Sequence, residues 1–100
     1  MSEIVLREQT KLIDTLKRKR IAFAALFGSQ AKGYAKPSSD YDFLVEFSPS
    51  VHYTLFDIVE VKASLEQLLK SKVDVITMGG LNHRLKDEVL SSMHVLYDER

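Results

Sequence analysis

Two aspartates separated by a single residue, Asp40 and Asp42, are the feature of the sequence most suited to chemistry. They stand at the start of segment 41–47, whose aromatic and β-branched residues predict a strand. Side chains two apart in a strand point to the same face, with α-carbons about 6 to 7 Å apart. Carboxylates held that close repel unless a cation or proton joins them, and oxygen ligands suit magnesium or manganese better than zinc. The pair predicts a metal site; the alternative is that Asp40 ends a turn and Asp42 faces solvent.

A glycine and a serine, Gly28 and Ser29, directly follow the apolar segment 21–27, which predicts a buried strand that ends in a tight turn. Free backbone N–H groups at such a strand-to-helix turn, together with the positive end of the helix dipole, can bind phosphate. Gly28 would let the backbone approach closely, and Ser29 would add its hydroxyl. Lys32 in the same loop could neutralise phosphate charge or could serve only solubility.

A third acidic residue, Asp74, stands between two valines in the predicted strand 73–77. A carboxylate in a strand that prefers a dry environment needs a partner, because an unpaired buried charge is costly. One interpretation pairs Asp74 with a lysine or arginine. The other places it beside the acidic pair, where it would face the same metals and take a proton from an attacking hydroxyl.

Other chemistries find less support in the residues. The spacing from Gly28 to Gly33 resembles the front of a P-loop, but Tyr34 and Ala35 stand where that motif requires lysine and serine or threonine. The sequence has no cysteine, which excludes disulfides and thiolate chemistry. Its three histidines show no ligand spacing, and we expect them on the surface or at helix ends: His52, His83 and His94.

The periodicity of apolar residues predicts the elements that must position these side chains. We expect helices over 3–20, from about 55 to 69 and over 81–93, strands over 21–27, 41–47 and 73–77, and a short edge strand over 95–97. The middle helix has Thr54 as its cap and an apolar face formed by Leu55, Ile58, Val59, Leu65, Leu68 and Leu69. Residues 17–20 are all basic, and we expect their charges to interact favourably with the negative end of the first helix dipole. Residues 1–100 show no linker or repeat, which predicts a single domain.

The overall charge argues against several partners. Fourteen basic residues balance fourteen acidic ones, so the chain lacks the field that would hold it on nucleic acid or an anionic membrane. No apolar run is long enough to span a bilayer, and the first residues lack the basic region of a signal peptide. We therefore expect a cytoplasmic protein without stable nucleic-acid or membrane binding.

Segments 27–33 and 39–43, with the sequences FGSQAKG and SDYDF, resemble the signature of the DNA polymerase β nucleotidyltransferase superfamily. The similarity is greatest to its minimal, single-domain branch (MNT), and segments 65–69, 73–76 and 95–97 follow the same branch. The resemblance implies an α/β (α+β) fold with a small mixed sheet flanked by helices.

The resemblance also assigns roles to the candidate residues. It implies two divalent ions, Mg²⁺ or Mn²⁺, held by Asp40, Asp42 and Asp74, and a nucleoside triphosphate, ATP, whose α-phosphorus is attacked. Gly28 and Ser29 would grip the triphosphate. Lys32 stands where many members have arginine, so a bidentate phosphate contact would become a single point charge.

Members of the minimal branch are frequently encoded beside a helical HEPN ribonuclease toxin and act as its antitoxin by transferring AMP to a tyrosine. The resemblance implies that role here, with a hetero-oligomer or a homodimer as the assembly. Two alternatives stay open: modification of a small molecule such as an aminoglycoside, and a non-catalytic module that masks its partner.

Overall fold

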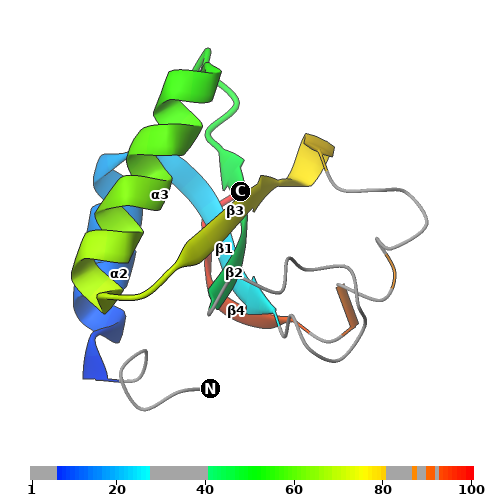
Figure 1. Ribbon diagram of the computed structural model, residues 1–100. Helices are drawn as coiled ribbons and strands as arrows, with labels where there is room; N and C mark the ends of the chain where they lie inside the picture. The colour runs from blue at the N-terminus through cyan, green and yellow to red at the C-terminus, as the bar shows by residue number, and fades with distance from the viewer. Residues whose placement is uncertain (1–6, 28–40, 81–86, 88–89, 92) are drawn as a thin grey trace.

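The computed structural model describes residues 7–27, 41–80, 87, 90, 91 and 93–100. Over these residues two helices lie on one side of a four-stranded sheet (Figure 1). The elements are α2 (Gln9–Arg18), β1 (Ile21–Phe27), β2 (Tyr41–Phe47), α3 (Leu55–Leu69), β3 (Val73–Thr77), the 3₁₀ turn η1 (Met78–Gly80) and β4 (His94–Asp98). Strands β1, β2 and β3 have the bounds that the sequence predicts, and β4 confirms the expected edge strand.

The sheet is mixed, as the family resemblance implies, with the strand order β3-β2-β1-β4. β1 pairs antiparallel with both β2 and β4, whereas β2 pairs parallel with β3. A parallel pair cannot be closed by a tight hairpin and needs a crossover connection, which α3 supplies here. The crossover places the start of β3 beside the start of β2.

The two faces of the sheet carry different side chains because neighbours along a strand alternate. The face under α2 and α3 holds the larger core, in which the helix residues Leu12, Leu16 and Leu65 pack against Phe43 and Val45. The opposite face holds a smaller apolar cluster whose members are Phe23, Ala25, Phe27 and Leu44, with Ile76, Met78, Leu90 and Met93 packed against it. The acidic residues of β2 and β3 share this second face.

Helix α3 begins with the expected cap. The backbone N–H of Thr54 donates to Asp57 Oδ2 at 2.7 Å, and the Thr54 side chain completes a reciprocal capping box with Asp57. The helix ends before Lys70, which adopts a left-handed φ of 55°.

The expected apolar face of α3 is wrong at Leu55 and Val59, which are 78% and 60% exposed. The other expected positions are buried or pack against the core, and Val61, which was not expected, is buried with them. Val59 and Val61 lie about 200° apart around the helix axis, so one helix cannot bury both against the same sheet. Figure 1 shows that the first turn of α3 extends past the sheet, where no strand lies beneath it.

The first and last expected helices are confirmed in part. α2 begins at Gln9 and buries Leu12 and Leu16, whereas residues 3–6 of the expected helix lie outside the described residues. Lys17 and Arg18 occupy its last turn, as expected for cations near a helix C-terminus. Within the expected helix 81–93, Asp87, Leu90 and Ser91 are helical and Met93 is not; the other residues of that range lie outside the described residues.

The described histidines agree with the sequence interpretation. His52 and His94 are exposed, although His94 begins β4 rather than lying in a helix; His83 lies outside the described residues. Among the described residues, no helix combines the length and the apolar character that crossing a bilayer requires.

Strand β4 is fastened to β1 by a side chain as well as by its backbone. Tyr97 donates its hydroxyl to the carbonyl oxygen of Ile21 at 2.6 Å. Burial, reinforced by the nearby charge of Glu99, raises the pKa of Tyr97 well above its ordinary value, so the hydroxyl stays protonated.

We predict that Tyr97→Phe lowers the free energy of unfolding by about 1 kcal/mol, because the buried carbonyl loses its donor. Urea denaturation followed by circular dichroism measures the change. Tyr53→Phe is the control, since Tyr53 is largely exposed. Equal stabilities for the two variants would show that the Tyr97 hydroxyl contributes nothing to holding β4.

Candidate active site

Asp42 and Asp74 lie side by side on neighbouring strands. They are register partners in the parallel pair of β2 and β3, where the backbones of adjacent strands are about 4.8 Å apart. Register partners point to the same face of a sheet, here the face opposite α2 and α3. The structure therefore brings together two of the three carboxylates that the sequence nominates.

The surroundings of the two carboxylates differ. Asp42 is fully buried in the central strand β2, and both of its carboxylate oxygens are shielded from solvent. Asp74 lies in the edge strand β3 and is partly accessible. A buried carboxylate is stable only if its charge is compensated. A pair of carboxylates with one buried and one accessible member is suited to bind a cation that enters from the solvent side.

Phe27 completes the described part of the site. It is the last residue of β1 and the register partner of Asp42 in the antiparallel pair. With Leu44 it forms an apolar wall on the face that carries the acids. The apolar run 21–27 predicts that Phe27 is buried, but its position opposite Asp42 depends on strand pairing that no local pattern specifies.

The other predicted site residues lie outside the described residues: Gly28, Ser29, Lys32 and Asp40. Their place in the chain still links them to the acid pair. Gly28 follows Phe27, which is paired with Asp42, and Asp40 precedes Tyr41, which begins β2.

The salt bridges of the described residues lie away from the acid pair. No lysine or arginine in the described part of the chain forms a salt bridge with Asp74. At the other end of the same face, Arg100 lies over the ring of Phe23 and forms salt bridges with Glu46 and Asp98. The hydrogen bonds from Arg100 lower the pKa of Asp98 below its usual range. Among described residues, therefore, the alternative of an ion pair at Asp74 has no partner.

The donor set fits a hard divalent cation. Asp42 and Asp74 offer only oxygen, which magnesium and manganese prefer. Within the described ranges, no three histidine, cysteine, aspartate or glutamate side chains gather closely enough to hold a metal. The third expected ligand, Asp40, lies outside those ranges, so two carboxylates of the expected three are placed.

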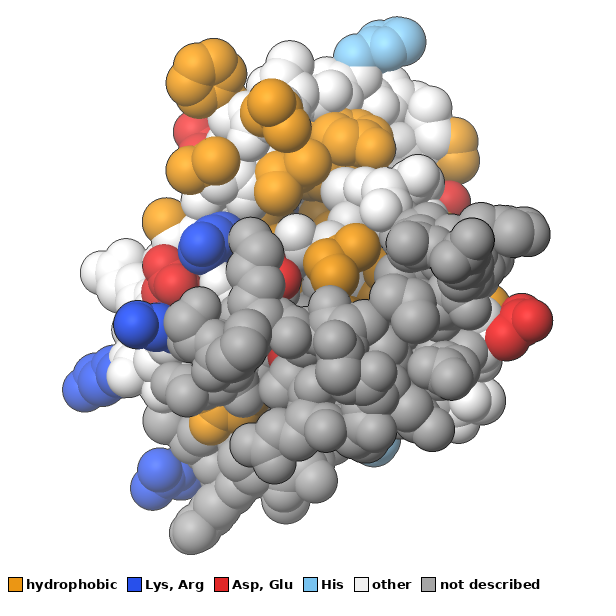
Figure 2. Space-filling view, turned by 45° about the vertical axis from the view of Figure 1, so that its right-hand side comes forward, with side chains coloured by type: hydrophobic (Ala, Val, Ile, Leu, Met, Phe, Trp, Pro, Cys, Tyr) orange, Lys and Arg blue, Asp and Glu red, His pale blue; other side chains and the backbone are white. Residues whose placement is uncertain are grey.

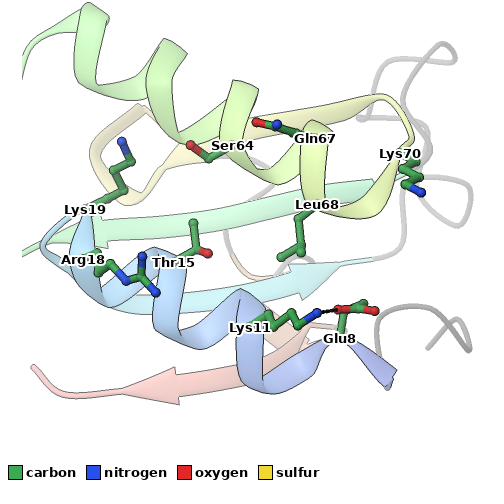
Figure 3. Close-up of a pocket in the computed structure, with 9 residues that line it drawn as sticks. All are labelled: Glu8, Lys11, Thr15, Arg18, Lys19, Ser64, Gln67, Leu68 and Lys70. Carbon is green, nitrogen blue, oxygen red and sulfur yellow. Dashed lines mark ion pairs between the residues drawn. The ribbon is translucent and has the colours of Figure 1, made fainter.

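A groove of about 720 Å³ lies between α2 and α3, on the side of the sheet opposite the acid pair (Figure 3). Its cations are largely neutralised: Lys11 pairs with Glu8 at 3.6 Å, and Lys19 pairs with Glu60 at 3.5 Å. Arg18, also on its rim, pairs with Asp14. This groove is a polar seam between two helices, and the sheet separates it from the acid pair.

Comparisons with known proteins agree with the fold and the signature. Residues 10–100 match the family described as polymerase beta, nucleotidyltransferase. A protein of Methanocaldococcus jannaschii, named "Putative protein adenylyltransferase MJ0435", is 38% identical over 81 residues, which cover 81% of this chain and 85% of that protein.

Two solved structures extend the comparison. One, described as a putative minimal nucleotidyltransferase, is 33% identical, covers 91% of both chains and has a TM-score of 0.71. The other contains the tri-AMPylated HEPN toxin of Shewanella oneidensis in complex with an MNT antitoxin. It is 21% identical, has a TM-score of 0.71 and covers 93% of this chain and 71% of that chain, so it supports the fold alone.

The chain belongs to the polymerase β nucleotidyltransferase family. The resemblance that the signature residues carry is thereby confirmed, and so is the enzyme class.

Proposed function

We propose that this protein is an antitoxin that transfers AMP from ATP to a tyrosine hydroxyl of a HEPN-type toxin. The observation that carries the proposal is the register of Asp42 with Asp74, which places two carboxylates at the end of β1, directly before Gly28 and Ser29 in the sequence. The relative from M. jannaschii bears the name of a protein adenylyltransferase, and a solved MNT antitoxin is bound to an AMPylated HEPN toxin. These names support AMP and a protein acceptor over a small molecule.

The proposed reaction joins the acceptor oxygen to the α-phosphorus of ATP and breaks the bond from that phosphorus to pyrophosphate. Asp40, Asp42 and Asp74 would hold magnesium or manganese, which would neutralise triphosphate charge and polarise the α-phosphate. Asp74 lies on the accessible edge strand and would accept the proton of the attacking hydroxyl. Fully buried Asp42 would orient the phosphates with little freedom to move.

The remaining residues would position the nucleotide. Gly28 and Ser29 would donate backbone N–H groups and a hydroxyl to the β- and γ-phosphates, and Lys32 would add one positive charge. The apolar wall of Phe27 and Leu44 keeps water from the inner side of the acid pair. A dry inner wall favours transfer to the acceptor over hydrolysis of ATP.

We predict that ATP binds appreciably only with magnesium or manganese, because the clustered carboxylates repel the triphosphate until cations bridge them. Titration calorimetry with and without EDTA measures this dependence. Equal affinity in the two conditions would contradict a metal-bridged site.

We further predict that Gly28→Val weakens ATP binding more than it lowers stability, because a branched side chain would block close approach of the backbone to phosphate. Melting and ATP titration on the same sample separate the two effects. Gly79→Val is the matched control, because the space around Gly79 is open to a side chain. A collapsed fold in the Gly28 variant, with no separate effect on binding, would assign Gly28 a structural role only.

A further inference from the structure

An exposed apolar surface covers the start of α3 and the loop before it. Its members, which we call the apolar patch, are Tyr53, Leu55, Phe56 and Val59, with exposed fractions of 41%, 78%, 82% and 60%. Figure 2 shows hydrophobic side chains gathered over this end of the molecule. The patch arises because the apolar residues of α3 extend around more of the helix than the sheet can cover.

The size of the patch indicates that another protein surface covers it. The four side chains together expose on the order of 500 Å² of largely apolar area. That value is near the upper end for a monomer, and a standard interface needs roughly 800 Å² from each partner. The patch alone therefore supplies more than half of one side of a stable interface.

A pocket beside the patch supplies further area. It has a volume of about 290 Å³ and lies where β2 and β3 end. Its walls are apolar at Phe47, Pro49, Val51 and Met78 and polar at Glu46, Ser48 and Thr77. Tyr53 belongs to both the patch and the pocket, and its ring stacks on Phe47 with centroids 4.3 Å apart. An exposed apolar ridge, formed by the patch, and a hollow with both apolar and polar walls thus lie next to one another on the same surface.

We propose that this surface is a homodimer interface in which Phe56 of each chain enters the pocket of the other. The ridge and the pocket share Tyr53, so the surface can be self-complementary. A twofold axis between two copies lets the ridge of each chain fill the pocket of the other. The surrounding charges are compatible with a second copy. Exposed Glu60 and Lys62 on α3 carry opposite signs, and the chain has no net charge, so two copies do not repel.

The interface would leave both candidate active sites open. The pocket lies at the end of β2 and the acid pair at its start, and Phe47 is five residues from Asp42, roughly 16 Å along the strand. The homodimer is thus independent of the proposed transfer reaction, and either can fail without the other.

Light scattering coupled to size-exclusion chromatography tests the proposal on the full chain across a concentration series. We expect wild type to reach twice the chain mass of 11.4 kDa and Phe56→Glu to remain at the single mass. Val95→Glu is the matched control, because Val95 is also an exposed apolar residue but lies on β4, away from the patch. A monomeric wild type, or a Phe56→Glu variant that still dimerises, would overturn the proposal.

A crosslinking experiment tests the arrangement without relying on loss of association. The chain has no cysteine, so Phe56→Cys in one copy and Pro49→Cys in another introduce the only thiols. Mixing the two under mild oxidation is expected to give a disulfide-linked dimer in greater yield than either variant alone. Equal yields would contradict the ridge-to-pocket arrangement.

A different protein on the patch is the outcome that would replace the homodimer. If wild type is monomeric alone and Phe56→Glu abolishes a stable complex with a HEPN-type protein, the patch binds that protein and a second copy is excluded. If the complex survives Phe56→Glu while wild type forms the homodimer, the two interfaces are separate and the proposal stands.

Discussion

Asp42→Asn is expected to lower AMP transfer by about three orders of magnitude or more while the protein remains folded. Asparagine has nearly the same shape, but it lacks the negative charge that would hold the divalent cation. Without that cation the triphosphate would not be positioned for attack. A thousandfold loss corresponds to about 4 kcal/mol of transition-state stabilisation. Asp42 is the register partner of Asp74, so removing its charge also removes the repulsion between the two carboxylates, and the melting temperature of the metal-free protein should be unchanged or higher.

Transfer is measured with labelled ATP and a HEPN-type acceptor, and stability is measured by thermal melting in EDTA. Asp14→Asn is the control, since this exposed acid pairs with Arg18 on α2, on the other side of the sheet. It should change neither quantity appreciably. Retention of transfer by the Asp42 variant would remove the buried carboxylate from the mechanism.

Asp74→Asn is expected to separate a catalytic carboxylate from a buried ion pair, because the two roles predict opposite changes in stability. Beside Asp42, the loss of its charge relieves repulsion, so the metal-free protein should be as stable or more stable. Transfer should nevertheless fall by about two to four orders of magnitude, because the acceptor hydroxyl loses its base.

If Asp74 instead neutralises a cation, the same substitution strands that cation and should cost roughly 3 to 5 kcal/mol of unfolding free energy. Melting in EDTA and the transfer rate together decide between the roles. A marked loss of stability with transfer intact would leave too few carboxylates for the proposed reaction.

The sequence predicts the strands well because their limits are set locally. Segment 21–27 is an apolar run followed by Gly28, and segment 41–47 is rich in aromatic and β-branched residues and is followed by serine and proline. Both strands appear with the expected bounds. Strand pairing is a different matter, because register depends on contacts between distant segments. The adjacency of Asp42 and Asp74 required the parallel pairing of β2 with β3, which only the family resemblance implied.

The same distinction explains the error on α3. Apolar periodicity identifies the helix, but it cannot show whether a second layer covers each apolar side chain. Leu55 and Val59 fit the pattern of a buried face and yet lie where the sheet has ended. The full burial of Asp42 was likewise beyond the sequence, because it follows from the central position of β2 and not from neighbouring residues.

The intact mass of a HEPN-type partner, co-expressed with this protein, tests the proposed function most directly. With the wild-type chain we expect the partner's mass to increase by one or more AMP groups, and with Asp42→Asn we expect no increase. An unmodified partner that remains in a stable complex with the wild-type chain would contradict AMP transfer and would show that neutralisation occurs by masking.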